Sequence, residues 1–224
     1  PARVKGVTVL VHDYIDSYEN PRRAWSYSPA TRRVRRAPDI TYDTLVNASP
    51  LIVVDQYGTF NGAQDKYNWE LKGVKKMVVA GVNNALGNNP LEVTHGVGHL
   101  NPEYVSYEEK EVAIVHATLK EGQRHLYASR TFYVTTDAFY IVSQDIYDGK
   151  GNLMRHALNT LTTEVAGLDG GCTINAEATF DFATRQYAVN NMLGSAINSQ
   201  PAVYNGQSKD VSFYTPDGLR RYAR

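Results

Sequence analysis

The sequence predicts a mainly β fold: an antiparallel sheet with a few short helices. Between residues 111 and 164, four strand-like runs are separated by short turns, and short turns join antiparallel neighbours. The 224-residue chain also contains 16 tyrosines, whose rings suit strands and half-wet apolar surfaces. Residues 24–36 add the pattern of an aromatic hairpin. Together these observations favour a β-sheet protein with a sizeable core.

The hairpin is the most distinctive local pattern. Its turn, residues 28–31, has Pro29 at the second position, where the fixed φ of proline suits the turn. Trp25 and Tyr27 precede it two residues apart, so both rings leave the same face of the strand. One face of residues 24–36 is therefore expected to be aromatic.

The return strand, residues 32–36, is rich in arginine, and Arg33 and Arg35 share one of its faces. These cations could contact anionic headgroups or an acidic partner surface. A solvated edge strand, on which charge blocks unwanted pairing, is the alternative. The 23 basic and 23 acidic residues of the chain cancel, and no nucleic-acid motif is present, so nucleic acid is not an expected partner.

The other elements follow from turn and capping signals. Asn101 and Thr215 each precede a proline, so each is expected to cap a short helix. Residues 83–90 are expected to form a loop, and Gly73 to interrupt a strand. The strands outside the hairpin are expected at residues 4–11, 51–55, 69–79, 111–119, 124–135, 138–147, 152–164, 173–182 and 186–192. No apolar run approaches the ~20 residues of a membrane helix.

Motifs for catalysis are missing from the sequence. It contains no GxSxG elbow, phosphate loop or dinucleotide fingerprint. Cys172 is the only cysteine and has no base nearby in the sequence, which favours a packing role. Asp145, Asp148 and Glu164 fall at strand ends or turns and leave open a glycosidase pair. We therefore predict no catalytic residue and no cofactor, with a hydrolase as the least favoured alternative.

The histidines offer weak metal signals. His95 and His99 stand four apart, but two glycines between them disfavour a helix, and no third ligand is evident. His116 and His125 flank a predicted turn and could lie near each other. Satisfied, partly buried imidazoles are favoured, because neither has a paired acid or nucleophile in the sequence. We predict no metal site.

A set of large apolar side chains is the main candidate for binding. An ordinary core would account for many of them. An apolar cavity that takes acyl chains is the functional interpretation, since each buried methylene is worth about 0.8 kcal/mol. The candidate ligand-binding residues are Trp25, Tyr27, Tyr57, Phe60, Trp69, Phe132, Phe139 and Ile141.

Five stretches, taken in order, resemble a family of large proteobacterial periplasmic proteins of unassigned function, related to the LolA/LolB outer-membrane lipoprotein-sorting fold. The stretches are NPRRAWSYSPATRRVRRAPDITY, DQYGTFNGAQDKYNWELKG, GHLNPEYVSYE, HATLKEGQRHLYASRTFYV and YTPDGLRRYAR. The resemblance implies a strongly curved, open half-barrel. It also implies that residues 1–224 are one β-rich domain, the C-terminal half of a longer Gram-negative periplasmic protein.

The resemblance also implies a function. We expect a non-enzymatic periplasmic carrier for a lipid, a lipoprotein acyl chain or another hydrophobic ligand moving towards the outer membrane. The aromatic set would line the concave face, and Arg33 and Arg35 would contact headgroups or a partner at its rim, with peripheral membrane contact. The alternative is a docking or adaptor module for a membrane transporter or an outer-membrane protein.

Overall fold

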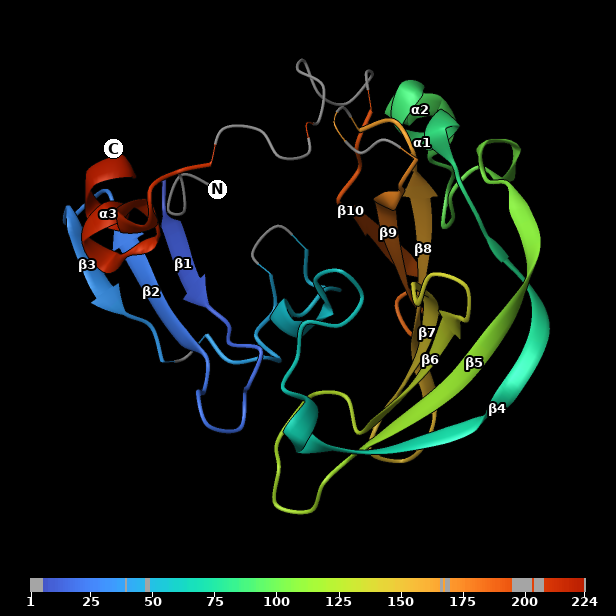
Figure 1. The fold of residues 1–224 in the computed structure, drawn as a ribbon, viewed down its shortest axis with the longest axis horizontal. Coiled ribbons are helices and arrows are strands. Elements are labelled where there is room, and N and C mark those ends of the chain that lie inside the picture. Colours follow the sequence, from blue (N-terminus) through green and yellow to red (C-terminus); the bar gives the residue numbers. More distant parts are fainter. Residues whose placement is uncertain are drawn as a thin grey trace.

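The structure is a computed structural model that describes residues 6–38, 40–46, 49–165, 167, 170–194, 203 and 208–223. Its strands form two antiparallel sheets, one of three strands and one of seven (Figure 1). The strands are β1 (Thr8–His12), β2 (Arg23–Ser28), β3 (Arg33–Arg36), β4 (Tyr67–Ala80), β5 (Tyr107–Leu119), β6 (Ser129–Thr135), β7 (Ile141–Tyr147), β8 (Leu153–Thr162), β9 (Thr173–Asp181) and β10 (Gln186–Asn190). The α-helices are α1 (Asn84–Asn88), α2 (Leu91–Thr94) and α3 (Pro216–Tyr222).

The small sheet confirms the predicted hairpin. Strands β1, β2 and β3 are neighbours in that order, and Trp25 pairs with Arg36 across the hairpin. Tyr27 is buried and Trp25 half-buried. The predicted helix cap at Thr215 is also confirmed, because its side chain accepts a hydrogen bond from the backbone N–H of Gly218 at 3.0 Å. The capped helix, α3, packs on this sheet (Figure 1).

The large sheet confirms the predicted meander. Its strands follow chain order from β4 to β10, so every connection joins antiparallel neighbours. The last hairpin, β9 and β10, lies close to its expected position. The strand expected at residues 124–135 begins only at Ser129. Residues 124–127 leave the ladder because the side chains of His125 and Tyr127 are buried against other segments, whereas the backbone of Ala128 still bonds to Leu119 and Tyr147.

The large sheet is strongly curved and open, as expected. At one end the backbone after β4 reaches β8, where the N–H of Asn83 donates to the carbonyl of Leu161 at 2.7 Å. Val79, Val112 and Val142, from β4, β5 and β7, pack together on one face near this end. Side chains from separated strands can meet only where a sheet curls, so this face is concave. The other edge strand, β10, does not pair with β4, and the sheet stays open.

The bulge in β4 assists this curvature. The register with β5 shifts between Leu71 and Gly73, and Gly73 has a φ of 132°, a conformation that side chains rarely adopt. A bulge adds bend and twist to a strand. The predicted interruption at Gly73 is therefore a bulge within one strand of 14 residues.

Two expected elements were wrong. Residues 51–55 form an isolated bridge from Val53 to Leu45 and then a 3₁₀ helix, Val54–Gln56. The contacts of Asp55 with Arg130 and His125, which lie far along the chain, determine this shape. Residues 83–90 contain α1, because Leu86 is drawn into the core that covers β8 to β10. Residues 4 and 5 of the first expected strand lie outside the described residues.

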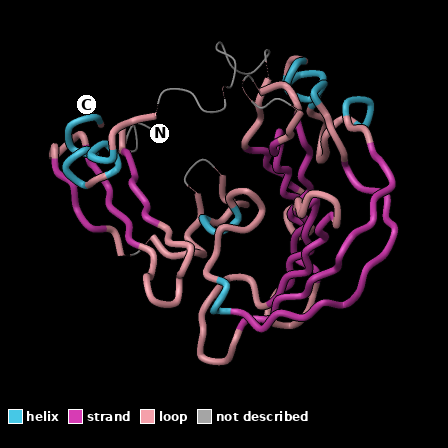
Figure 2. Tube along the Cα trace, viewed as in Figure 1, coloured by secondary structure: helices cyan, strands magenta, loops and turns pink. Residues whose placement is uncertain are grey.

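Residues 51–66 cover the convex face of the large sheet. In Figures 1 and 2 this segment lies on one side of β8 to β10, and the arch of β4 and β5 lies on the other. The segment includes two 3₁₀ turns, Val54–Gln56 and Gln64–Lys66. Among the described helices, none has the length and apolarity that a membrane crossing requires.

Candidate functional site

An aromatic pocket lies where residues 51–66 meet the convex face. It has a volume of about 310 Å³. Trp69 and Phe132 stack with their ring centroids 5.8 Å apart, and Phe60 meets both rings edge-on, at 5.5 and 5.4 Å. The lining is apolar except for one amide: Phe60, Gln64, Trp69, Val115, Phe132, Val134 and Ile141. We call this site the aromatic pocket.

Strand alternation and register bring the lining together. Val115 of β5 lies directly opposite Phe132 of β6, and Val134 lies opposite Ile141 of β7. Alternate residues of a strand share a face, so these four side chains point to the same side of the sheet. Trp69 comes from β4, and its indole N–H donates to the carbonyl of Gln64 at 2.8 Å. This hydrogen bond fixes the orientation of the indole.

The pocket continues into an exposed apolar strip along β4. Trp69 is 40% exposed, and Leu71, which pairs with Val115, is 63% exposed. Beyond the bulge, Val74 pairs with Ala113 and is 48% exposed. An apolar strip that joins an apolar pocket is typical of a surface that meets an apolar ligand or partner.

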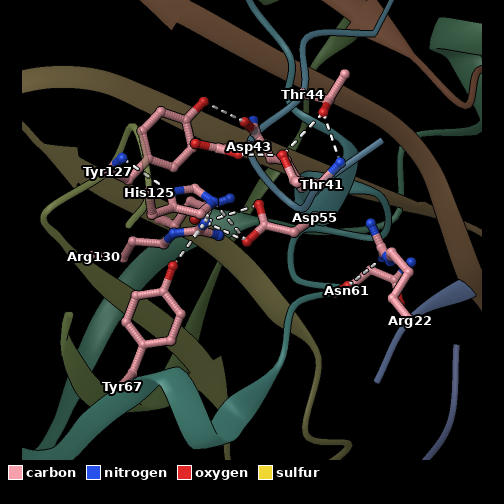
Figure 3. Close-up of polar contacts among 12 residues, drawn as sticks. Arg22, Thr41, Asp43, Thr44, Asp55, Asn61, Tyr67, His125, Tyr127 and Arg130 are labelled. Carbon is pink, nitrogen blue, oxygen red and sulfur yellow. Dashed lines mark hydrogen bonds and ion pairs between the residues drawn. The ribbon is translucent and has the colours of Figure 1, made fainter. Parts of the chain in front are cut away.

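A buried ion pair holds residues 51–66 against the sheet. Nη2 of Arg130 donates to both carboxylate oxygens of Asp55, at 2.8 and 2.6 Å (Figure 3). The side chains are 0% and 1% exposed. Nε and Nη1 of Arg130 have no hydrogen-bond partner among the described residues. The rings of Phe60, Tyr67 and Tyr127 surround the guanidinium instead, with centroids 4.8–5.6 Å from its Cζ. Aromatic faces attract a desolvated cation.

His125 completes the charge cluster. Its Nδ1 accepts a hydrogen bond from the N–H of Tyr127 at 2.9 Å, so in the neutral ring the proton lies on Nε2. Nε2 is 3.1 Å from Asp55 and donates to it (Figure 3). Burial pushes the pKa of Asp55 up, but Arg130 and His125 outweigh it and hold that pKa below its usual value. Asp55 is therefore an anion that the fold surrounds with donors.

A second group of contacts fixes the chain just before Phe60. The N–H of Thr59 donates to Glu177 of β9 at 2.5 Å, and the carbonyl of Thr59 accepts from Gln144 of β7 at 2.9 Å. Thr59 also accepts from the amide of Asn159, and its φ is 74°. Burial raises the pKa of Glu177 although several donors reach it. These contacts and the Asp55–Arg130 ion pair fix the backbone just before Phe60, whose ring lines the aromatic pocket.

The structure brings four of the eight candidate aromatic-set residues together: Phe60, Trp69, Phe132 and Ile141. We expected them to line the concave face of the sheet. The strands converge at the curled end of the concave face, where Val79, Val112 and Val142 pack with Met77 and Tyr133. The bulky rings lie instead on the convex face, under residues 51–66.

The other four candidates lie elsewhere. Trp25 and Tyr27 are in the small sheet. Tyr57 borders a groove beside β10. Phe139 lies in the turn between β6 and β7, is 79% exposed, and has a φ of 57°. None of these four lines the aromatic pocket.

Arg33 and Arg35 are exposed on β3, paired with Ser28 and Ser26. No described residue forms an ion pair with either side chain. Their contact with a headgroup or a partner stays a prediction.

The histidines and carboxylates serve local contacts. His116 bonds to Thr131 and His125 to Asp55, so the structure shows no contact that joins the two histidines. Asp145 accepts from Tyr133 at 2.7 Å and lies 2.7 Å from Nδ1 of His156. Within the described ranges, no three metal-binding side chains gather in one place.

Sequence reasoning missed the residues that hold the pocket in shape. Arg130 was one available signal, because it alternates with Phe132 and Val134 on an otherwise apolar strand face. A cation on such a face requires a buried acid. The sequence could not show that this acid is Asp55, 75 residues away.

Known proteins match this chain in sequence and in fold. An uncharacterized protein of Pseudomonas aeruginosa, PA3922, is 34% identical over 228 residues, which cover 99% of this chain and 48% of that protein. The chain thus spans about half the length of this curated relative. Solved structures of a DUF1329 family protein from Desulfovibrio piger and of a domain from Vibrio parahaemolyticus, named provisionally for outer membrane lipoprotein sorting, share the fold.

The D. piger structure has a TM-score of 0.58 at 18% identity and covers 98% of this chain and 73% of that one. For the V. parahaemolyticus domain the TM-score is 0.57 at 14% identity, with 99% and 74% covered. The family model described as "Protein of unknown function (DUF1329)" matches residues 1–220. The chain therefore belongs to the DUF1329 family and shares its fold with these two solved structures.

Proposed function

We propose that this protein is a non-enzymatic periplasmic carrier that binds a lipid, a lipoprotein acyl chain or a similar apolar ligand. The observation that carries the proposal is the aromatic pocket, which is almost entirely apolar and joins the exposed strip at Leu71 and Val74. Ligand pockets in proteins are mostly apolar, with a few polar groups that orient the ligand. Here Gln64 is the one polar side chain in the lining.

The chemistry of the pocket favours a hydrocarbon chain. No charged side chain lines it, so a charged ligand would lose its hydration without gaining a partner. At ~0.8 kcal/mol for each buried methylene, eight methylenes would contribute about 6 kcal/mol to binding. The strip along β4 offers further apolar area to a longer chain.

The buried contacts that hold residues 51–66 in place favour a role of the aromatic pocket in ligand binding. The ion pair of Asp55 and the hydrogen bond from Thr59 to Glu177 fix the segment at two points, both of which precede Phe60. A site that is held in its bound shape does not lose conformational entropy when the ligand arrives, and so binds more tightly.

The fold supports the periplasmic part of the proposal. The V. parahaemolyticus domain, named provisionally for outer membrane lipoprotein sorting, has the same fold. We extend that role to this chain: it would accept an apolar ligand and move it towards the outer membrane, with residues 1–224 as one β-rich unit of a longer protein.

A fluorescent apolar probe, N-phenyl-1-naphthylamine, tests the proposal. We expect Trp69→Glu to abolish the fluorescence rise that the probe shows with the wild-type protein. Phe139→Glu introduces the same charge at an exposed ring outside the pocket and should leave binding unchanged. Circular dichroism confirms that both variants are folded. Equal binding by a folded Trp69→Glu protein would refute the assignment of the pocket.

The natural ligand can be identified directly. Protein purified from its native host is extracted with organic solvent, and the extract is analysed by mass spectrometry. We expect a stoichiometric lipid or other apolar molecule. An empty extract from the full-length protein would favour the docking module for a membrane transporter or an outer-membrane protein.

A further inference from the structure

A second pocket lies between the small sheet and α3. It has a volume of about 460 Å³ and contains four arginines. We call it the arginine pocket, and its polar and aromatic residues are Arg32, Arg33, Arg36, Arg220, Trp25 and Asp217. It belongs to the three-stranded sheet, whereas the aromatic pocket belongs to the seven-stranded sheet.

The walls of the arginine pocket are held in place by the fold. Arg36 lies opposite Trp25 in the β2–β3 register. The segment that leads into α3 is tied to β1, because Nε2 of His12 lies 2.7 Å from the carbonyl oxygen of Tyr214. A Cβ at Gly218 would come within 2.2 Å of the carbonyl oxygen of Ser212, so the helix approaches this segment as closely as glycine allows. The arginines of β3 and α3 therefore face a common space.

The pocket carries a concentrated positive charge. Four guanidinium groups against the one carboxylate of Asp217 leave a net charge of +3. Arg220 lies 3.4 Å from Asp217. Arg32, Arg33 and Arg36 form no ion pair or hydrogen bond through their side chains with any described residue. A positively charged concavity attracts and concentrates anions.

This arrangement departs from the rest of the chain. The formal net charge of the protein is zero. Outside the pocket, Arg22 pairs with Asp13 at 2.6 Å and Arg155 pairs with Asp181 at 2.9 Å, whereas Arg32, Arg33 and Arg36 gather in one pocket without such a partner in the described part of the chain. Unpaired arginines that converge on one pocket repel each other, and an anionic ligand would relieve that repulsion.

The donor chemistry selects phosphate. Guanidinium groups form paired hydrogen bonds with phosphate oxygens, and three or four such groups match the charge and the acceptors of a phosphate ester. Trp25 gives the pocket one apolar wall, and its ring is held edge-on to His12 at a centroid distance of 4.8 Å. That wall suits the carbon atoms next to a phosphate.

We propose that the arginine pocket binds a phosphate-bearing ligand. Arg32, Arg33 and Arg36 hold the phosphate oxygens, Arg220 adds charge from α3, and Trp25 contacts the adjoining carbon atoms. The ligand is either the headgroup of an anionic phospholipid or a soluble phosphate ester. Because the site does not use the aromatic pocket, it can be tested separately from the carrier function.

Calorimetric titration and vesicle flotation test the proposal on the whole chain at low ionic strength. The soluble ligands are inorganic phosphate and glycerol 3-phosphate, and the vesicles contain phosphatidylglycerol or, as the net-neutral control, phosphatidylcholine. We expect Arg32→Gln and Arg36→Gln each to weaken binding about tenfold, as the loss of a charge-assisted hydrogen bond does. Arg124→Gln removes an exposed arginine outside the pocket and should leave binding unchanged.

The outcomes separate the two sources of phosphate. Binding only to phosphatidylglycerol vesicles identifies a lipid headgroup, and binding of glycerol 3-phosphate in solution identifies a soluble ester. The proposal is overturned if no phosphate-bearing ligand binds, or if Arg124→Gln weakens binding as much as Arg36→Gln. Loss of probe binding in Trp69→Glu with unchanged phosphate binding would separate the two sites.

Discussion

Replacing Arg130 with methionine tests how residues 51–66 are held on the sheet. Methionine fills part of the space of the arginine but leaves Asp55 buried without its cation. Asp55 is 1% exposed, and both of its oxygens accept from Arg130, at 2.8 and 2.6 Å. Breaking a buried pair by removing one partner costs about 3–5 kcal/mol. We expect Arg130→Met to lower the free energy of unfolding by about that amount at neutral pH.

The cost should depend on pH in a defined direction. The pKa of Asp55 is lower in the folded protein than its ordinary value of 3.8. Its stabilising contribution is therefore fully present above pH 3.8 and is lost as the pH falls through the folded pKa. The difference between wild type and Arg130→Met should shrink over that acidic range. Urea titrations at several pH values measure it.

Arg130→Lys is the matched control. Only Nη2 of the arginine bonds to Asp55, so one ammonium group can replace that contact, and the lysine variant should lose less stability. The reasoning would be refuted if Arg130→Met lost under about 1 kcal/mol at neutral pH and its deficit did not change with pH.

Three further predictions concern other positions. Burial raises the pKa of Glu177, so its native state loses stability as the pH rises from 4.5 through the folded pKa; Glu177→Gln should remove this slope in urea titrations. Thr215→Ala removes the cap of α3 and should cost about 1 kcal/mol, measured by urea unfolding monitored by circular dichroism. Phe139→Asn should stabilise the protein by about 1 kcal/mol in thermal unfolding, because asparagine tolerates the left-handed conformation that Phe139 adopts.

Local signals were sufficient to predict most of the fold. The meander follows from turn sequences such as residues 148–151, whose conformation depends on nearby residues. The cap at Thr215 is local in the same way. Residues 51–55 have the composition of a strand, yet their conformation is determined by the contact of Asp55 with a residue far along the chain. Local propensity could not contain that information.

The candidate site was predictable to a similar extent. Strand alternation indicates which residues of a strand share a face of the sheet. Trp69 and Phe132 lie on the same face, where their rings stack. Which face is concave depends on how β4 curls towards β8, a long-range property. Trp25 belongs to a separate sheet, and the sequence around it contains no signal that distinguishes the two sheets.

The purpose of the Asp55–Arg130 pair leads to a last prediction. A buried ion pair is weak evidence for stability, because an apolar pair of similar volume is often equally stable. The specific geometry of this pair, however, fixes where Phe60 lies relative to Trp69. We therefore expect the double variant Asp55→Leu/Arg130→Met to recover stability relative to Arg130→Met but to bind N-phenyl-1-naphthylamine more weakly than wild type. Recovery of both stability and probe affinity would show that apolar packing alone places Phe60, and that the ion pair has no part in forming the pocket.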